Sequence, residues 1–186
     1  NYKVKNIDMV ELSYINSDNN KNYLKLFKKN NNYKLIGDTF DGRLLINKLL
    51  TGDSNKSFFK IFKNLNSKII LSLEKLKIDN NSYLKKIEGY LIVKNNEIQS
   101  GKIDAILNKE NKFSYILKTT SNKQKITNIF VEEPAPFIKN YKFIKGFENG
   151  NLSFNSIKKN GIVNSIIKIY DFKVKEVPLL AKVLSL

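Results

Sequence analysis

The chain of 186 residues has no cysteine, no histidine and no tryptophan, and it contains only one methionine and three prolines. Without cysteine it can form no disulfide, no thiolate nucleophile and no zinc–thiolate site. Without histidine it lacks the commonest general base and metal ligand. These absences leave only Ser–Lys pairs or carboxylates as possible groups for covalent or acid–base chemistry.

The remaining candidates for such chemistry have simpler structural interpretations. Apart from Ser185, the serines fall in predicted strands or polar turns, and none lies in a Gly-x-Ser-x-Gly elbow. Glu132 and Glu133 are adjacent, so they would point apart in a strand; beside Pro134 we expect them in the first turn of a helix. The segment 37–42, GDTFDG, has no lysine after its second glycine and is not a phosphate loop. We therefore predict no catalytic residues, no metal and no cofactor, and that the chain is not an enzyme.

The charge is strongly basic but is carried almost entirely by lysine. Arg43 is the only arginine among 33 basic residues, and the formal net charge is +16. Proteins that bind nucleic acid use arginine for bidentate contacts to phosphate and guanine, and here the lysines are scattered along strands and turns. We therefore expect no nucleic-acid partner and interpret most lysines as a solvated exterior, although an anionic membrane surface would also attract them.

We interpret residues 1–186 as a single fragment of a larger protein, because the chain starts at Asn1 without a methionine or a leader segment. No apolar run approaches the ~20 residues that a membrane-spanning helix needs. No linker rich in glycine, proline and serine divides the chain, so no firm internal boundary is predicted.

Period-two alternation of apolar and polar residues dominates the chain. Turn signals about every dozen residues separate the alternating segments, which is typical of antiparallel sheet. The Asn160-Gly161 pair is a strong signal for a two-residue hairpin turn between strands over 151–157 and 162–174. The sequence predicts a mainly β fold of about ten strands, the others lying at 4–14, 23–28, 33–37, 68–73, 87–94, 102–107, 113–118 and 126–131. Segment 75–79 would start a further strand or form a bulge.

Three short helices are predicted after strands. The first covers 41–50, with Thr39 or Asp41 as cap and Gly52 after its end. The second covers 134–141 and begins at a proline, and the third covers 178–186. Because a sheet with an apolar face must be covered, two arrangements remain open. The sheet could fold back as a sandwich or barrel, or it could curve and hold lipid acyl chains.

The end of the chain resembles a known family. Segment 169–186, IYDFKVKEVPLLAKVLSL, is similar to a stretch near the C-terminus of AsmA-like envelope proteins of the YhdP and TamB kind. Segments 33–50, 67–78 and 84–91 resemble earlier elements of that region in the same order. The chain departs from the pattern at Glu133-Pro134-Ala135, which replaces Asp-Ala-Gly, and at Glu148-Asn149-Gly150, which replaces paired glycines.

The resemblance implies a long, twisted or curved antiparallel sheet that forms a groove or half-tube. Its parent protein would be anchored in the inner membrane, extend through the periplasm toward the outer membrane, and move phospholipid. This chain would be a non-catalytic part of the wall, with acyl chains as its partners. The alternative is a scaffold or assembly module of the cell envelope with a side-chain-filled β-sandwich core. The predicted lipid-binding residues are Ile69, Leu71, Leu73, Leu91, Val93, Ile103, Ala105, Leu107, Tyr115, Leu117, Phe154, Ile167 and Ile169.

Overall fold

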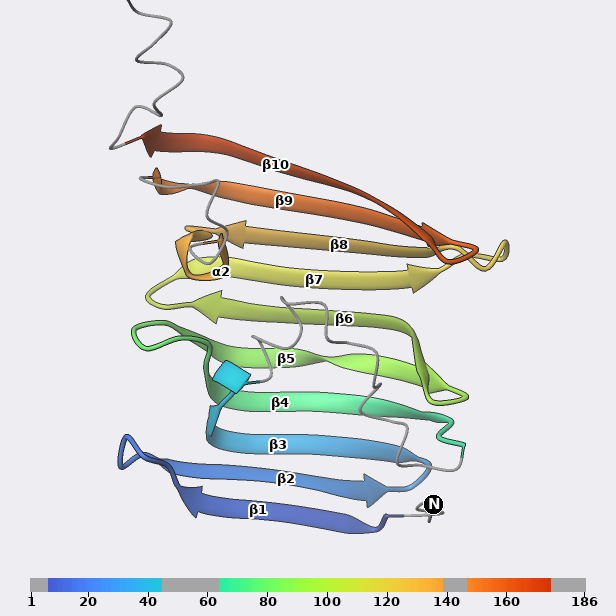
Figure 1. Ribbon diagram of the computed structural model, residues 1–186. Helices are drawn as coiled ribbons and strands as arrows, with labels where there is room; N and C mark the ends of the chain where they lie inside the picture. Colours follow the sequence, from blue (N-terminus) through green and yellow to red (C-terminus); the bar gives the residue numbers. More distant parts are fainter. Residues whose placement is uncertain (1–6, 45–63, 139–146, 175–186) are drawn as a thin grey trace, which may run out of the picture.

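The computed structural model describes residues 7–44, 64–138 and 147–174, and these residues form one open β-sheet. Its ten strands lie side by side in the order in which they occur in the chain, from β1 at one edge to β10 at the other (Figure 1). The strands are β1 (Met9–Ile15), β2 (Lys21–Lys29), β3 (Asn32–Asp41), β4 (Ser67–Lys77), β5 (Tyr83–Lys94), β6 (Glu97–Leu107), β7 (Asn111–Thr119), β8 (Lys125–Glu132), β9 (Phe147–Lys159) and β10 (Ile162–Val174).

The mainly β class and the number of about ten strands are confirmed. The sheet is mostly antiparallel, but β3 and β4 run parallel, with Leu35 opposite Leu71. Parallel neighbours need a long crossover connection, and the chain between Asp41 and Ser67 supplies it. The sequence left open whether a new strand or a bulge begins at 75–79: β4 continues without a break to Lys77, and a bulge lies beside this point in β5.

The expectation of about three helices is not supported. Within the described residues the structure gives the bounds of one short helix, α2 (Ala135–Ile138), inside the second predicted helix, and residues 43 and 44 of the first predicted helix are also helical. The helix at 178–186 lies outside the described residues, and so does most of the one at 41–50. α2 packs on the sheet through Phe137, whose ring stacks on that of Phe113 at 5.6 Å between centroids.

Asparagine turns close several hairpins. At the predicted hairpin, Lys159 pairs with Ile162, and the two turn residues Asn160 and Gly161 have φ angles of 51° and 81°. Asn30, Asn95, Asn96 and Asn108 also have positive φ and lie at or next to strand ends. Asparagine tolerates this left-handed conformation better than most residues. Many of the asparagines therefore have a structural role in the turns between consecutive strands.

Most of the buried hydrophobic side chains form two clusters. The first consists of Leu73, Ile78, Leu84, Ile87, Ala105, Leu107 and Val131, and the second of Tyr33, Leu65, Ile69, Leu71 and Val93. A β-bulge in β5 shifts its register against β6 between Lys85 and Glu88, with Lys86 at a φ of 49°. Because a bulge re-aims the side chains beside it, it brings Leu84 into line with Leu107.

Candidate functional site

The candidate site is one face of the sheet, here called the apolar face. Residues paired across a ladder lie on the same face, so the register defines a row that crosses all ten strands. That row is apolar except for one glycine and one tyrosine, and it consists of Val10, Leu26, Leu35, Leu71, Gly89, Ile103, Tyr115, Ile129, Phe154 and Ile167.

The neighbouring row, one residue further along each strand or one residue back, lies on the opposite face. It has a different composition, with four acidic or serine positions at its centre. Its members are Glu11, Lys25, Ile36, Ser72, Glu88, Asp104, Ser114, Phe130, Ser153 and Lys168. The two faces of the sheet are therefore chemically distinct.

All thirteen residues predicted to bind lipid lie on the apolar face. The register places Ile69, Leu91 and Leu117 in one row through Gly101, and Ala105 and Ile169 in another through Phe113, Val131 and Leu152. The prediction missed several members of this face, including Val10, Leu12, Leu24, Leu26, Leu35, Ile129 and Val131. The apolar–polar alternation that predicted strands in most of these segments also indicates these residues.

Exposure rises from the central strands of the apolar face toward the edges. Ile69, Leu71, Val93, Ala105 and Leu107 are buried. Tyr115, Leu117 and Phe154 are half-buried, and Ile167 on β10 is 52% exposed. On β1 the side chains of Val10 and Leu12 are also exposed. The exposed apolar side chains of this face are therefore on the outer strands β1 and β10.

Tyr115 lies in a part of this face that is largely shielded from water. Burial raises the pKa of its hydroxyl above the ordinary value of 10.0. A low-dielectric surrounding disfavours the phenolate. Tyr115 lies between Ile103 and Ile129 in the apolar row, which accounts for that surrounding.

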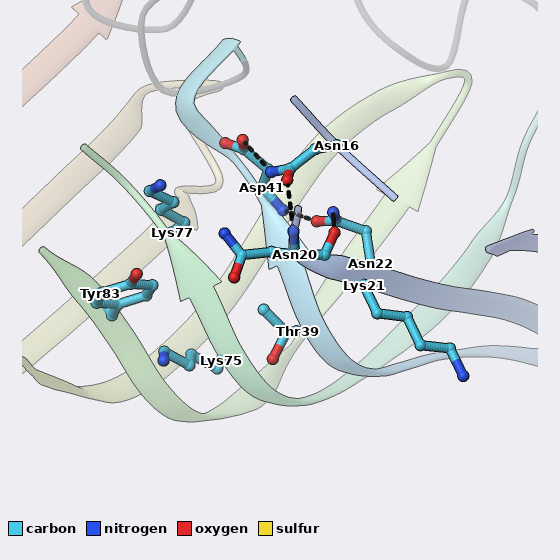
Figure 2. Close-up of a pocket in the computed structure, with 9 residues that line it drawn as sticks. All are labelled: Asn16, Asn20, Lys21, Asn22, Thr39, Asp41, Lys75, Lys77 and Tyr83. Carbon is cyan, nitrogen blue, oxygen red and sulfur yellow. Dashed lines mark hydrogen bonds between the residues drawn. The ribbon is translucent and has the colours of Figure 1, made fainter. Parts of the chain in front are cut away.

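At one end of β3–β5, polar side chains gather on the face opposite the apolar one. Leu76 pairs with Leu84, and Leu84 pairs with Leu107, so beyond the bulge the apolar face continues through Leu76 and its β3 partner Phe40. Lys75 pairs with Lys85, which pairs with Ile106 on the opposite face. Lys77 and the β3 partners Thr39 and Asp41 lie on that opposite face too, and these residues form a polar end of the sheet (Figure 2).

An ion-pair network of four side chains holds this polar end together. The Arg43 guanidinium donates to Asp41 through Nε, at 2.9 Å from Oδ1, and to Asp18 through Nη2, at 2.7 Å from Oδ2. Lys77 Nζ lies 2.7 Å from the same Asp18 oxygen. The hydrogen bond from Lys77 lowers the pKa of the Asp18 carboxyl below its ordinary value of 3.8. The hydrogen bond from Arg43 does the same for the pKa of Asp41.

Two buried asparagine contacts complete this end. Asn22, which is fully buried, accepts a hydrogen bond from the Asp41 backbone N–H at 2.6 Å. Asn16 Nδ2 donates to Asp41 Oδ2 at 3.0 Å. Both Asp41 oxygens therefore have donors, and the only arginine of the chain is used for structure here.

The adjacent carboxylates Glu132 and Glu133 do not lie in the first turn of a helix, so that expectation is wrong. Glu132 Oε2 accepts a hydrogen bond from the Lys112 backbone N–H at 2.7 Å, and Glu133 Oε2 accepts one from Asn111 Nδ2 at 2.7 Å. Glu133 has a φ of 51°, which is outside helical geometry. Both side chains are therefore fixed to the start of β7.

Comparison with known proteins finds no matching family model, curated protein or solved structure. Among the described residues, no three acidic side chains lie close enough together to hold a metal ion. In the same part of the chain, no helix has the length and hydrophobicity needed to cross a membrane.

Proposed function

We propose that this chain is a non-catalytic segment of a bridge-like protein that moves phospholipid between membranes. In this proposal the sheet curves as part of a groove or half-tube, and its apolar face lines the path of the acyl chains. The parent protein is anchored in the inner membrane and extends through the periplasm toward the outer membrane.

The observation that carries this proposal is the apolar row across all ten strands. In a compact domain such a face is normally covered by a second layer. Here Ile167 at one end of the row is 52% exposed, and Val10 at the other end is 47% exposed. Large exposed apolar surfaces usually mark an interaction site. An acyl chain lying across the outer strands would gain about 0.8 kcal/mol for each CH₂ removed from water.

The order of sequence elements gives independent support. The segments that resemble AsmA-like proteins include β3, β4, part of β5 and the end of β10, so they extend over much of the sheet. A conduit wall needs a continuous apolar strip and no reactive groups. The absence of histidine and cysteine from the sequence fits such a role.

The test uses two neighbouring residues of β10 that lie on opposite faces. Ile166 is 59% exposed and Ile167 is 52% exposed, so an aspartate at either position should disturb folding to a similar, small extent. Ile167→Asp places a charge on the apolar face, and Ile166→Asp places the same charge on the other face. The chain is purified from bacterial membranes without harsh detergent, and bound lipid is measured by native mass spectrometry and solvent extraction.

We expect phospholipid on the unaltered chain and on Ile166→Asp, and a several-fold loss on Ile167→Asp. Circular dichroism should confirm that both variants keep the sheet. Equal lipid content in both variants, or a lipid-free unaltered chain, would refute the proposal. The lipid-free result would favour a scaffold of the cell envelope, with the apolar face covered by protein.

A further inference from the structure

The first strand leaves one edge of the sheet open. β1 pairs with β2 on one side, and in the described part of the chain no strand pairs with its other side (Figure 1). All seven residues of β1 are exposed. The unpaired backbone groups of an edge strand form a template for pairing with another strand, so this edge can accept one.

Two hydrogen bonds at the ends of the β1–β2 hairpin show which backbone groups of β1 face the open edge. The Asn16 N–H donates to the Asn20 carbonyl at 3.0 Å, and the Lys28 N–H donates to the Asp8 carbonyl at 2.8 Å. Between them the ladder keeps one register, in which hydrogen-bonded pairs alternate with pairs that are not hydrogen-bonded. The even-numbered residues of β1 therefore bond to β2, and the odd-numbered residues from 9 to 15 direct their N–H and C=O groups outward.

The β1 edge lacks the features that usually prevent pairing. Lysines, prolines and bulges are common protective features of edge strands. The β1 sequence, MVELSYI, has no lysine, proline or glycine, and five of its seven residues are apolar. Its one charged side chain, Glu11, is paired with Lys25 of β2 at 3.4 Å. Short segments with high β-propensity, low net charge and no proline pair readily with copies of themselves.

The other edge of the sheet has protective features that β1 lacks. β10 contains Lys168 and Lys173, and between them Asp171 has a φ of 56° and is skipped by the ladder to β9. A residue in this conformation interrupts regular strand pairing. No residue of β1 has a positive φ. Of the two edges, β1 is therefore the one suited to a partner strand.

Two copies of β1 fit each other in one antiparallel register. When Leu12 lies opposite Leu12 of a second copy, Met9 lies opposite Ile15 and Glu11 lies opposite Ser13. These odd-numbered residues are the ones whose backbone groups face outward, so each such pair can exchange two hydrogen bonds. The register uses all seven residues of the strand, and each Glu11 carboxylate faces a serine.

Other antiparallel registers are less favourable. A shift by one residue places outward-facing backbone groups opposite groups that are already bonded to β2. A shift by two residues in one direction brings Glu11 opposite Glu11, and like charges directly opposite each other are destabilising. The same shift in the other direction leaves Met9 and Val10 without partners.

We propose that β1 is a dimerisation edge, through which two copies of this chain form one continuous sheet around a two-fold axis at Leu12. Residues opposite each other share a face, so Val10, Leu12 and Tyr14 of both copies join the two apolar faces. On the opposite face, Met9 and Ile15, which are 57% and 68% exposed, cover each other. The proposal needs only the open edge and does not rest on lipid binding.

The test relies on the absence of cysteine from the chain, which lets one introduced cysteine report a contact. Leu12→Cys and Val10→Cys alter positions on the same face of β1 that are 42% and 47% exposed. In the dimer the two Cα atoms at position 12 would be about 4.5 Å apart, within disulfide range. Those at position 10 would be roughly 14 Å apart, which is too far. The full chain is oxidised with copper phenanthroline, and the linked fraction is measured on a non-reducing gel.

We expect a disulfide-linked dimer from Leu12→Cys and almost none from Val10→Cys. Mixing Val10→Cys with Tyr14→Cys should restore the link, because positions 10 and 14 lie opposite each other in this register. Equal yields from Leu12→Cys and Val10→Cys would overturn the proposal, and so would no link from Leu12→Cys or no link in the mixture.

Sedimentation velocity tests the same edge without cysteine, from micromolar to millimolar chain and in salt that screens the net charge of +16 on each copy. Ser13→Pro removes an N–H that faces the open edge, a position where proline is tolerated, and Ser13→Ala keeps that N–H. We expect the unaltered chain and Ser13→Ala to dimerise equally. Ser13→Pro should raise the Kd about tenfold or more because two backbone hydrogen bonds are lost. A monomeric unaltered chain, or equal Kd values for the two variants, would overturn the proposal.

Discussion

Replacing Gly89 by alanine should destabilise the sheet, although Gly→Ala in a strand is normally favourable. Gly89 lies in the apolar row on β5, next to the bulge at Lys85–Glu88. A Cβ atom built there would lie 2.1 Å from the Lys102 carbonyl oxygen and 2.8 Å from the Ile103 Cα atom. Both are backbone atoms of β6, so no side-chain rotation can relieve the clash, and the two strands must separate.

The expected magnitude follows from two opposing effects. Removing a glycine from a strand interior gains roughly 0.5–1 kcal/mol through lower backbone entropy in the unfolded chain. Forcing an extra carbon into a close-packed contact loses typically 1–3 kcal/mol, and more where backbone must move. We therefore expect a net loss of about 1–2 kcal/mol, measured as the free energy of unfolding in urea by circular dichroism.

Gly101→Ala is the matched control, because Gly101 is in the next strand on the same face. Its nearest neighbours would be the Leu91 Cδ2 methyl at 2.6 Å, which can rotate away, and the Tyr90 carbonyl oxygen at 3.0 Å, a milder backbone contact than the one at Gly89. The loss in Gly101→Ala should be clearly smaller. A Gly89→Ala protein as stable as the unaltered chain, or more stable, would refute the close approach of β5 and β6.

Three further predictions can be tested with the same unfolding measurement. Leu107→Ala should lose about 2–5 kcal/mol because Leu107 is 0% exposed, whereas Leu12→Ala, at a 42% exposed position, should change stability by less than about 1 kcal/mol. Gly161→Ala should lose about 1 kcal/mol, since its φ of 81° is strained for alanine although no atom lies within 4 Å of the new Cβ. Lowered pKa values of Asp18 and Asp41 predict stability that is complete well above pH 3.8 and falls as the pH drops through the folded-state values. Asp41→Asn should flatten that fall, and an acid dependence identical to that of the unaltered chain would contradict the ion-pair network.

The sequence predicted the strands well from β5 onward because their alternation is regular. The Asn160-Gly161 turn fixed both strands beside it, since a two-residue turn determines the register. The parallel pairing of β3 and β4 could not be predicted, because it depends on a contact between segments separated by a long connection. Of the helix predicted at 134–141, the described residues confirm positions 135–138.

The members of the apolar face were predictable for the same reason as the strands. Leu71, Ile103, Tyr115 and Ile167 were assigned to one side of their own strands, and the register then joins them in one row. The polar end was not predicted. Asp18, Asp41 and Lys77 come from three separate parts of the chain, so only the folded sheet brings them together.

The claim that the apolar face contacts lipid can be tested most directly by photocrosslinking. Tyr115 on the apolar face and Tyr90 on the opposite face are both half-buried aromatic residues in central strands. Each is replaced in turn by p-benzoylphenylalanine, and the chain is irradiated with vesicles of phosphatidylethanolamine and phosphatidylglycerol. Mass spectrometry should find phospholipid adducts at position 115 and few at position 90. No adduct at 115, or equal yields at the two positions, would contradict the account.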